Sequence, residues 1–236
     1  MIMKISVIIP AYNEEKNIER CIKSLLSQAY SRDDYEIIVV DGGSKDRTIE
    51  IAQNLGAKAI SQKSRYIEGA RNDGAFIARG DIVAFTDADI VLPDTWLKTI
   101  EKDFNRDIQC VFGPLLPSKN TAFYRALFYL GNKMMYAGSR TNLFHNICGA
   151  NCAFRKEAFM KLNGFRELSA AEDVEIGVRL KKLGRIYFDK KMKVRYSTRR
   201  IEKFGLMRIL PVWISNSFNA LRNRQREANY AKMDYS

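Results

Sequence analysis

Residues 79–93 read Arg-Gly-Asp-Ile-Val-Ala-Phe-Thr-Asp-Ala-Asp-Ile-Val-Leu-Pro. They combine a short apolar run with two closely spaced aspartates. Four apolar residues, 82–85, follow a Gly-Asp turn, and a short apolar run behind a turn is typical of a buried strand. Beyond the run, Asp87 and Asp89 are two residues apart and would face the same way on an extended segment. Their like charges repel unless a cation lies between them. A hard divalent metal ion, which also binds phosphate oxygens, would provide that cation. An isolated Asp-x-Asp is more often a turn before the next helix, so the metal prediction depends on its context.

A strand–turn–helix pattern is repeated upstream. The predicted strands are 4–10, 35–40, 57–60 and 82–85, and the predicted helices between them are 18–26, 49–55 and 67–78. Glu14 and Glu15 would occupy the first turn of the first helix, where acidic side chains suit the helix dipole. Strands that alternate with helices predict an α/β fold with a mostly parallel central sheet flanked by helices. Ligands of such sheets gather at the carboxyl ends of the strands, where the loops at Tyr12, Asp41 and Asp87 would meet.

The totals fit a globular chain. With 236 residues, 46% of them hydrophobic, there is room for a sizeable core in one large α/β domain or two small ones. No run approaches ~18 apolar residues, and the N-terminus lacks the features of a signal peptide, so we expect neither a membrane span nor secretion. The four cysteines follow no framework spacing, which favours a reducing cytoplasm.

The positive charge is concentrated at one end of the chain. Residues 181–236 carry 15 Lys+Arg and 4 Asp+Glu, a net charge of +11, whereas the other 180 residues carry 24 and 23, a net charge of +1. Such asymmetry indicates a surface that meets an anionic partner. A merely solvated basic face is the alternative. No nucleic-acid-binding motif accompanies the charge, so nucleic acid is not the expected partner.

The first loop favours one kind of nucleotide site over others. Neither the dinucleotide fingerprint Gly-x-Gly-x-x-Gly nor the phosphate loop Gly-x-x-x-x-Gly-Lys-[Ser/Thr] occurs in the sequence. The first turn instead offers an aromatic ring, Tyr12, and an acid, Glu14. The ring can stack on a base, Asp41 can accept from a base or ribose, and Arg71 can pair with phosphate. The pattern predicts a metal-held diphosphate with a nucleoside over the first two strands.

The chain resembles family-2 glycosyltransferases in an ordered set of motifs. These are Val-Ile-Ile-Pro-Ala-Tyr-Asn-Glu-Glu at 7–15, Val-Val-Asp-Gly-Gly-Ser-Lys-Asp-Arg-Thr at 39–48, Ala-Arg-Asn-Asp-Gly-Ala at 70–75 and Asp-Ala-Asp at 87–89. The resemblance continues through 149–155, Gly164-Phe165 and Glu172-Asp173 to about Gly184, some three quarters of the chain. Any one motif is weak, but the set in this order and spacing is specific.

The resemblance implies a Rossmann-like fold of the type called GT-A. It also implies an inverting transferase that moves a sugar from a UDP- or GDP-sugar to a hydroxyl or phosphate acceptor. Asp87 and Asp89 match the family's Asp-x-Asp, which binds Mn²⁺ or Mg²⁺ across the diphosphate, and Asp173 matches its general base. The predicted donor-binding residues are Pro10, Ala11, Tyr12, Glu14, Asp41, Gly43, Arg71, Asp87, Ala88, Asp89 and Asn151.

Two positions depart from the family's pattern. The usual Asp-Asp-Gly-Ser is Asp41-Gly42-Gly43-Ser44 here, so one acidic contact is missing. Many members carry a histidine or another polar metal ligand after the base, and residues 194–196, Val-Arg-Tyr, offer none. The resemblance therefore leaves metal ligands beyond Asp87 and Asp89 undefined.

The general base can also be argued from its chemistry. Inversion requires a carboxylate that takes a proton from the attacking hydroxyl, on the side of the sugar opposite the leaving diphosphate. Residues 170–175, Ala-Ala-Glu-Asp-Val-Glu, open a predicted helix, and Asp173 in its first turn would be held rigidly and kept ionised by the helix dipole. Glu172, our second catalytic candidate, and Glu175 are the rivals, and simple capping of the helix is the alternative.

His145, Cys148 and Cys152 suggest a zinc site, but tetrahedral zinc needs a fourth ligand and none is near in sequence. We expect the two cysteines to flank a buried strand on the acceptor side instead, with Asn151 near the sugar.

Two apolar segments with scattered basic residues, 121–137 and 203–218, suit helices lying on anionic lipid, the second broken at Pro211. The alternatives are that they cover the sheet or form a homodimer contact. The predicted organisation is a transferase domain at 1–198, with a nucleotide-sugar half at 1–92 and an acceptor half at 93–198, and a basic, partly helical extension at 199–236. We expect a cytoplasmic enzyme, peripheral on the membrane, with a glycan or lipid-linked acceptor.

Two other function classes stay open at this point. One is a catalytically silent nucleotide-sugar-binding or membrane-scaffold protein on the same fold, since fold does not fix function. The other is a nucleotidyltransferase, although the glycine-rich first loop of such enzymes is missing.

Overall fold

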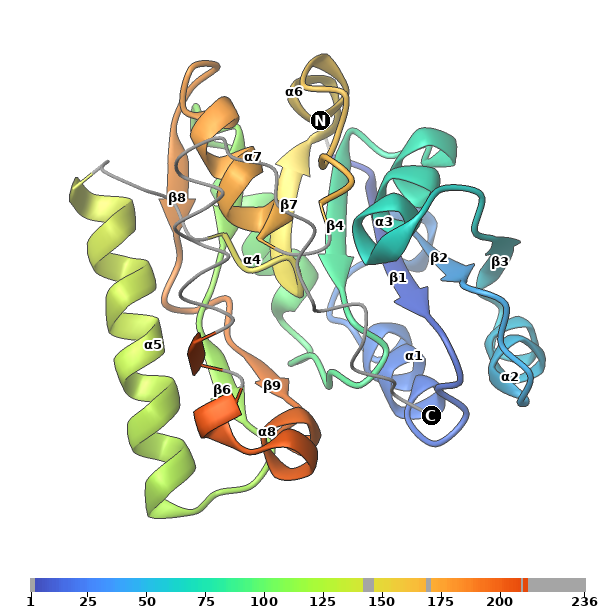
Figure 1. Cartoon of the computed structure of the whole chain (residues 1–236). Helices are drawn as coiled ribbons and strands as arrows, with labels where there is room; N and C mark the ends of the chain where they lie inside the picture. Colours follow the sequence, from blue (N-terminus) through green and yellow to red (C-terminus); the bar gives the residue numbers. More distant parts are fainter. Residues whose placement is uncertain (1–2, 142–146, 169–170, 209, 212–236) are drawn as a thin grey trace.

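Seven strands form one central sheet in the order β3-β2-β1-β4-β7-β5-β8 (Figure 1). The computed structural model describes residues 3–141, 147–168, 171–208 and 210–211. The strands of this sheet are β1 (Ile5–Ala11), β2 (Tyr35–Asp41), β3 (Lys58–Ser61), β4 (Ile82–Thr86), β5 (Cys110–Phe112), β7 (Asn151–Arg155) and β8 (Ile186–Phe188). The helices are α1 (Ile18–Leu26), α2 (Thr48–Asn54), α3 (Tyr66–Ile77), α4 (Trp96–Phe104), α5 (Ala122–Thr141), α6 (Lys156–Lys161), α7 (Glu172–Leu180) and α8 (Arg199–Phe204), with a 3-10 turn at Arg32–Asp34.

The four strands predicted from the N-terminal half are present and parallel. β1 pairs with β2 from Ile5 opposite Tyr35 to Ala11 opposite Asp41, and β4 lies on the other side of β1. β3 extends the sheet beyond β2. Because these strands run the same way, the loops after β1, β2 and β4 lie at one edge of the sheet, as predicted.

The C-terminal half joins the same sheet through an antiparallel strand, β7. It pairs antiparallel with both β4 and β5, and β8 then pairs parallel with β5. A small second sheet is formed by β6 (Leu115–Pro117) and β9 (Val194–Tyr196). Cys152 lies inside β7 and is fully buried, so the expectation that Cys148 and Cys152 flank a strand is wrong for Cys152.

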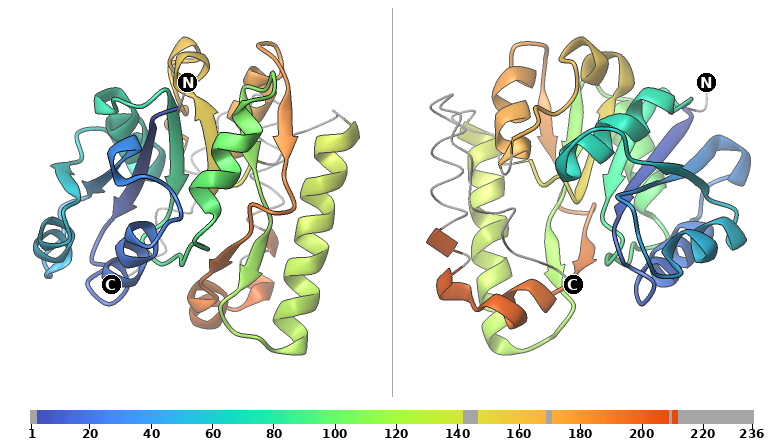
Figure 2. Two further views of the ribbon diagram at one scale, coloured as in Figure 1. Left: turned by 180° about the vertical axis from the view of Figure 1, so that it is seen from behind. Right: turned by 45° about the vertical axis from the view of Figure 1, so that its right-hand side comes forward.

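The helices cover the sheet in two layers (Figures 1 and 2). Buried side chains of α1, α2 and α4 pack with one face of the sheet, and those of α3, α6 and α7 pack with the other. The second layer contains an aromatic cluster in which Phe85, Phe154, Phe159 and Phe165 lie with ring centroids 5.2–5.9 Å apart. This cluster fixes β4 against β7 and α6, and so supports the loop that follows β4.

The prediction that Glu14 and Glu15 lie in the first turn of the first helix is wrong. The first helix begins at Ile18, and Glu14 and Glu15 lie in the turn before it. Their N–H groups donate to the side chains of Thr48 and Asp46 in the neighbouring loop, at 2.8 and 3.1 Å. These side-chain acceptors hold the turn outside the helix, so the Glu14 carboxylate faces the edge of the sheet.

Among the described residues, no helix has the combined length and apolarity that crossing a bilayer requires.

Candidate active site

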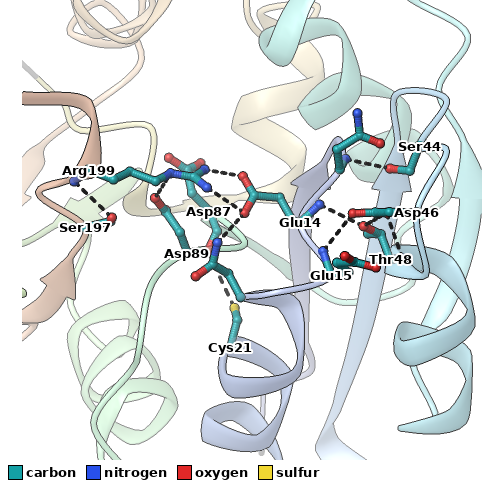
Figure 3. Close-up of polar contacts among 12 residues, drawn as sticks. Glu14, Glu15, Cys21, Ser44, Asp46, Thr48, Asp87, Asp89, Ser197 and Arg199 are labelled. Carbon is teal, nitrogen blue, oxygen red and sulfur yellow. Dashed lines mark hydrogen bonds and ion pairs between the residues drawn. The ribbon is translucent and has the colours of Figure 1, made fainter. Parts of the chain in front are cut away.

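Asp41, at the end of β2, organises the first two loops. Its carboxylate accepts hydrogen bonds from the Gly43 N–H at 3.0 Å and from both the N–H and the hydroxyl of Ser44. The Ser44 hydroxyl accepts in turn from the Asn13 N–H at 2.9 Å (Figure 3). Gly43 has φ of 93°, which glycine adopts without strain. Asp41 therefore fixes the backbone of both loops, a role that limits what it can offer to a ribose.

The other residues predicted on these loops differ in what they can present. Pro10 and Ala11 are buried within β1, and Ala88 is buried between the two aspartates, so these three can meet a ligand only through backbone groups. Tyr12 is 49% exposed, and its ring is open to a planar ligand.

Arg71, in the middle of α3, connects the two halves of the site. Its side chain is buried, and one terminal nitrogen lies 2.9 Å from Asp87 Oδ1 while the other lies 2.8 Å from Glu172 Oε1. Burial alone would lower the pKa of the guanidinium, but the charges of Asp87 and then Glu172 outweigh burial and raise it. Because Asp87 follows β4 and Glu172 begins α7, one side chain couples the Asp-x-Asp to the helix that carries the predicted base.

The three acids at the start of α7 have different partners. Glu172 pairs with Arg71, and Glu175 pairs with Arg179 at 2.6 Å and with Arg166 at 3.2 Å. Asp173 forms no ion pair with any residue that the structure describes. Its carboxylate accepts from the Val174 N–H at 2.9 Å and from the Gly149 N–H at 3.4 Å.

The environment of Asp173 also favours proton transfer. Burial, and after it the neighbouring charge of Glu172, raises the pKa of the Asp173 carboxyl to about 7. A carboxyl with a pKa of about 7 is about half ionised at neutral pH, and its ionised form is basic enough to accept a proton.

Glu14 and Asp89 share a partner that comes from the far end of the chain. Arg199, at the start of α8, lies with its two terminal nitrogens on the Glu14 carboxylate and its Nε 3.2 Å from Asp89 Oδ2 (Figure 3). Burial and then the charge of Asp87 raise the pKa of the Asp89 carboxyl to about 6. This corner of the site therefore concentrates negative charge, and a cationic side chain offsets it.

The chemistry of these donors fits a hard divalent cation. Asp87 uses Oδ1 for Arg71 and Asp89 uses Oδ2 for Arg199, and the second oxygen of each has no hydrogen bond or ion pair within the described part of the chain. No set of three or more His, Cys, Asp and Glu side chains converges as a metal centre in the same ranges. Two carboxylate oxygens suit Mg²⁺ or Mn²⁺, which commonly complete their shells with water and substrate phosphate.

Asn151 does not support its predicted role. The side chain is fully buried at the start of β7, where its Nδ2 donates to the Met192 carbonyl at 2.7 Å and its Oδ1 accepts from the Trp96 indole at 2.9 Å. These bonds join α4 to the loop before β9. Asn151 therefore holds the core together, and nothing in its geometry directs it to a sugar. His145, the third residue of the suggested zinc set, lies outside the described residues.

The sequence model of a family described as "Glycosyl transferase family 2" matches residues 6–162, which include every loop of this site except the start of α7 and Arg199. The chain belongs to glycosyl transferase family 2. The family resemblance expected from the motifs is thereby confirmed, and so is the mostly parallel α/β fold.

Relatives and solved structures agree with this membership. The chain is 39% identical over 100 residues to "Glycosyltransferase AglE" of Haloferax volcanii, and the aligned segment covers 40% of this chain and 33% of the relative. It is 24% identical over 177 residues to the "Glucosyl-dolichyl phosphate glucuronosyltransferase" of the same organism, covering 69% and 56%. The chain thus spans about a third to a half of the length of these family members.

One solved structure matches almost the whole fold. It is the mannosyltransferase PcManGT from Pyrobaculum calidifontis in complex with GDP-Man and Mn²⁺, with a TM-score of 0.79 and 22% sequence identity. The match covers 98% of this chain and 68% of that one. At this identity the likeness establishes the GT-A fold for this family member.

The contacts of two residues in the candidate site could not be predicted from the sequence. Arg199 is 185 residues from Glu14, and nothing in a run of basic residues singles out the one that reaches the site. Ser44 was part of a quoted motif, but its bond to Asn13 joins two loops that only the folded sheet brings together.

Proposed function

We propose that this chain is a metal-dependent, inverting glycosyltransferase that uses a nucleotide-diphospho-sugar. The nucleoside would lie over the ends of β1 and β2, against the Tyr12 ring, with the diphosphate directed toward Asp87 and Asp89. Nucleotide sugars bound to structural neighbours, such as GDP-Man in PcManGT, support this class of donor.

The observation that carries the proposal is the arrangement of carboxylates around Arg71. Arg71 pairs with Asp87 and Glu172, and Glu175 pairs with arginines of its own. Of the three acids at the start of α7, Asp173 alone lies outside any ion pair within the described residues. Asp173 is therefore the acid free to accept the proton of an attacking hydroxyl. That oxygen bonds to the anomeric carbon as the bond to the diphosphate breaks, which inverts the configuration in a single displacement.

Asp87 and Asp89 are the residues that would hold Mn²⁺ or Mg²⁺, and such an ion would neutralise charge that develops on the leaving diphosphate. Arg71 fixes the Asp87 carboxylate in one orientation through its 2.9 Å contact. Arg199 pairs with both Glu14 and Asp89, so it must release these carboxylates, or move with them, when a donor enters.

A lipid-linked acceptor is the finer proposal for the substrate. It is supported by the name of the glucuronosyltransferase relative, which acts on a dolichyl phosphate sugar, and by the net charge of +11 over residues 181–236. The extension at 199–236 carries 8 Lys+Arg and 3 Asp+Glu, a net charge of +5 out of this +11, and most of it lies outside the described residues.

Donor binding tests the proposal directly. A panel of GDP- and UDP-sugars should raise the melting temperature of the chain with Mn²⁺ present, because a ligand that binds the native state stabilises it. EDTA should abolish the shift, and Asp89→Ala should lose it while keeping the unliganded melting temperature within a few degrees. Undiminished binding in EDTA would exclude the metal-held diphosphate.

The second candidate, a silent nucleotide-sugar-binding protein, shares that binding result and differs in turnover. Asp173 favours the enzyme, because it forms no ion pair within the described residues and a binding protein has no need for a carboxyl with a pKa of about 7 at this position.

A further inference from the structure

α5 lies on the side of the molecule far from β3 (Figure 1), and it exposes a stripe of large apolar side chains. Phe123, Leu130 and Met134 are 55%, 60% and 57% exposed, and their spacing places them on one face of the helix. Side chains of this size are rarely left exposed in a row unless they meet a partner.

The stripe is not needed to hold α5 in place, because the opposite face of the helix does so. Phe128 packs on Tyr196 of β9 with ring centroids 6.2 Å apart, and Tyr136 packs on Phe188 of β8 at 5.8 Å. The Asn132 amide exchanges two hydrogen bonds with the Leu115 backbone of β6, at 3.0 and 2.8 Å. The helix is therefore fixed against both sheets and turns its second apolar face outward.

Cations border the stripe, and α5 contains no acidic residue. Lys133 is exposed on one flank of the stripe, and Arg140 lies on the same flank at the C-terminal end of the helix. Arg140 also lines a cleft of about 710 Å³ between α5 and β8.

The cleft is strongly basic. Besides Arg140 it is lined by Lys181, Arg185, Lys190 and Lys191, and among the described residues that line it Asp189 is the one acid. The Asp189 carboxylate accepts the Lys191 N–H at 2.8 Å, and the Lys190 ammonium lies 4.3 Å from the centroid of the Tyr136 ring. The cleft is thus built to receive anionic oxygens, and it opens beside an apolar helix face.

We propose that the α5 stripe and the α5–β8 cleft together form a docking surface for an anionic phospholipid bilayer. The stripe enters the interface between headgroups and acyl chains, and the cleft receives headgroup phosphates. An apolar face flanked by cations without acids matches the two properties of such a surface, its hydrocarbon and its negative charge. A nucleic acid would use the cations but not the exposed Phe123, Leu130 and Met134.

The position of the surface gives it a relation to the site. α5 packs on β6, β6 pairs with β9, and β9 leads within three residues to Arg199 on Glu14 and Asp89. This inference extends the proposed function, because it places the enzyme on a membrane, where a lipid-linked acceptor would lie. Its test needs neither donor nor acceptor, so it can fail while the transferase assignment stands.

The test is flotation of the full chain with vesicles of phosphatidylcholine alone or mixed with phosphatidylglycerol. We expect binding to the anionic vesicles that weakens at high salt, and little binding to neutral ones. Leu130→Ser combined with Met134→Ser should reduce partitioning at least tenfold. Arg185→Glu combined with Lys191→Glu should reduce it by about fivefold or more for each charge changed.

Matched controls are available on other faces of the molecule. Phe76→Ser removes an aromatic side chain that is 75% exposed on α3, and Lys98→Glu reverses an exposed charge on α4. Both should bind vesicles as the wild type does, and circular dichroism should show the native fold in every variant.

Three results would overturn the proposal. One is no binding of the wild type to anionic vesicles at low salt. Another is wild-type binding by both double variants, which would assign the binding to other residues. The third is a wild-type dimer in size-exclusion chromatography that the Leu130→Ser and Met134→Ser changes dissociate, which would make the stripe a contact between copies.

Discussion

Arg71 shows how one buried side chain can set the geometry of a site. Its charge lies between two carboxylates, and its removal would leave Asp87 and Glu172 close together and partly buried with no counter-ion. Breaking a buried pair of this kind typically costs about 3–5 kcal/mol, because the desolvated partner keeps its charge. The arginine therefore contributes to folding as well as to the orientation of Asp87.

Arg71→Ala should lower the free energy of unfolding by about 3–5 kcal/mol, measured by urea denaturation. Arg79→Ala is the control, since Arg79 is 81% exposed and its pair with Glu36 should be worth less than about 1 kcal/mol. Equal effects of the two substitutions would show that the buried network does not stabilise the fold.

Gly149 is the residue that lets Arg71 reach its partners. A Cβ at this position would lie 2.8 Å from Arg71 Nη1 and 3.0 Å from its Cζ, so the guanidinium would have to move. Gly149→Ala should cost about 1–3 kcal/mol of stability, the usual range for overpacking. Gly131→Ala in α5, where nothing lies within 4 Å, should instead stabilise by up to about 1 kcal/mol through helix propensity. Thermal unfolding should show opposite signs, and a stabilising Gly149→Ala would refute the packing argument.

Arg199 pairs with Asp89, one of the two carboxylates that the proposed metal requires. Arg199→Gln should therefore raise the affinity of the donor-free protein for Mn²⁺ alone several-fold, as measured by isothermal titration calorimetry, because a competing cation is removed. Arg195→Gln is the matched control, since Arg195 is exposed on β9 and makes no ion pair within the described ranges. Unchanged or weaker Mn²⁺ binding in Arg199→Gln would contradict the competition.

At the scale of elements, the first turn of α7 holds a carboxyl, that of Asp173, whose protonation changes near neutral pH. The pKa of Asp173 is raised to about 7, mainly by burial, so a fraction of the carboxyl that grows as pH falls below 7 holds a proton. The protonated form cannot accept the proton of an acceptor hydroxyl. The value of kcat/KM should therefore rise with pH through about 7 and fall about tenfold per unit below it. A pH–rate profile that stays level down to about pH 5 would remove Asp173 as the base.

The elements of the N-terminal half could be predicted from the sequence because their signals are local. β1, β2 and β4 are β-branched or apolar runs ended by turn residues, and each lies within one residue of its predicted bounds. The position of Glu14 and Glu15 outside α1 could not be predicted, because it depends on acceptors from Asp46 and from Thr48 at the start of α2.

In the candidate site, too, some residues could be predicted from local motifs and others only from the folded chain. Asp87, Asp89 and Asp173 stand in motifs with recognisable spacing, whereas Arg199 reaches Glu14 only through the path of β9 and α8. Asn151 also follows a motif, yet tertiary packing uses its amide to join Trp96 to the Met192 carbonyl. Motif position alone cannot separate a side chain that binds a ligand from one that holds the core.

At the scale of the molecule, the two predicted halves are not separate bodies, because β4 and β7 pair within one sheet. The 93–198 half brings α7 to the edge where β1, β2 and β4 end, and Arg71 then joins the two halves by ion pairs. The start of the predicted extension, Arg199, is also part of the site. The residues predicted for donor binding and for proton transfer thus lie on one continuous sheet with its helices.

Release of nucleoside diphosphate from the GDP- and UDP-sugar panel, with Mn²⁺, is the measurement that tests this assembly most directly. We predict turnover by the wild type and a rate about 10²–10⁴-fold lower in Asp173→Asn, with donor affinity nearly unchanged. Glu167→Gln, an exposed acid close in sequence, should behave as the wild type. Wild-type turnover in Asp173→Asn, or a donor that binds with Mn²⁺ and is never cleaved, would contradict the account.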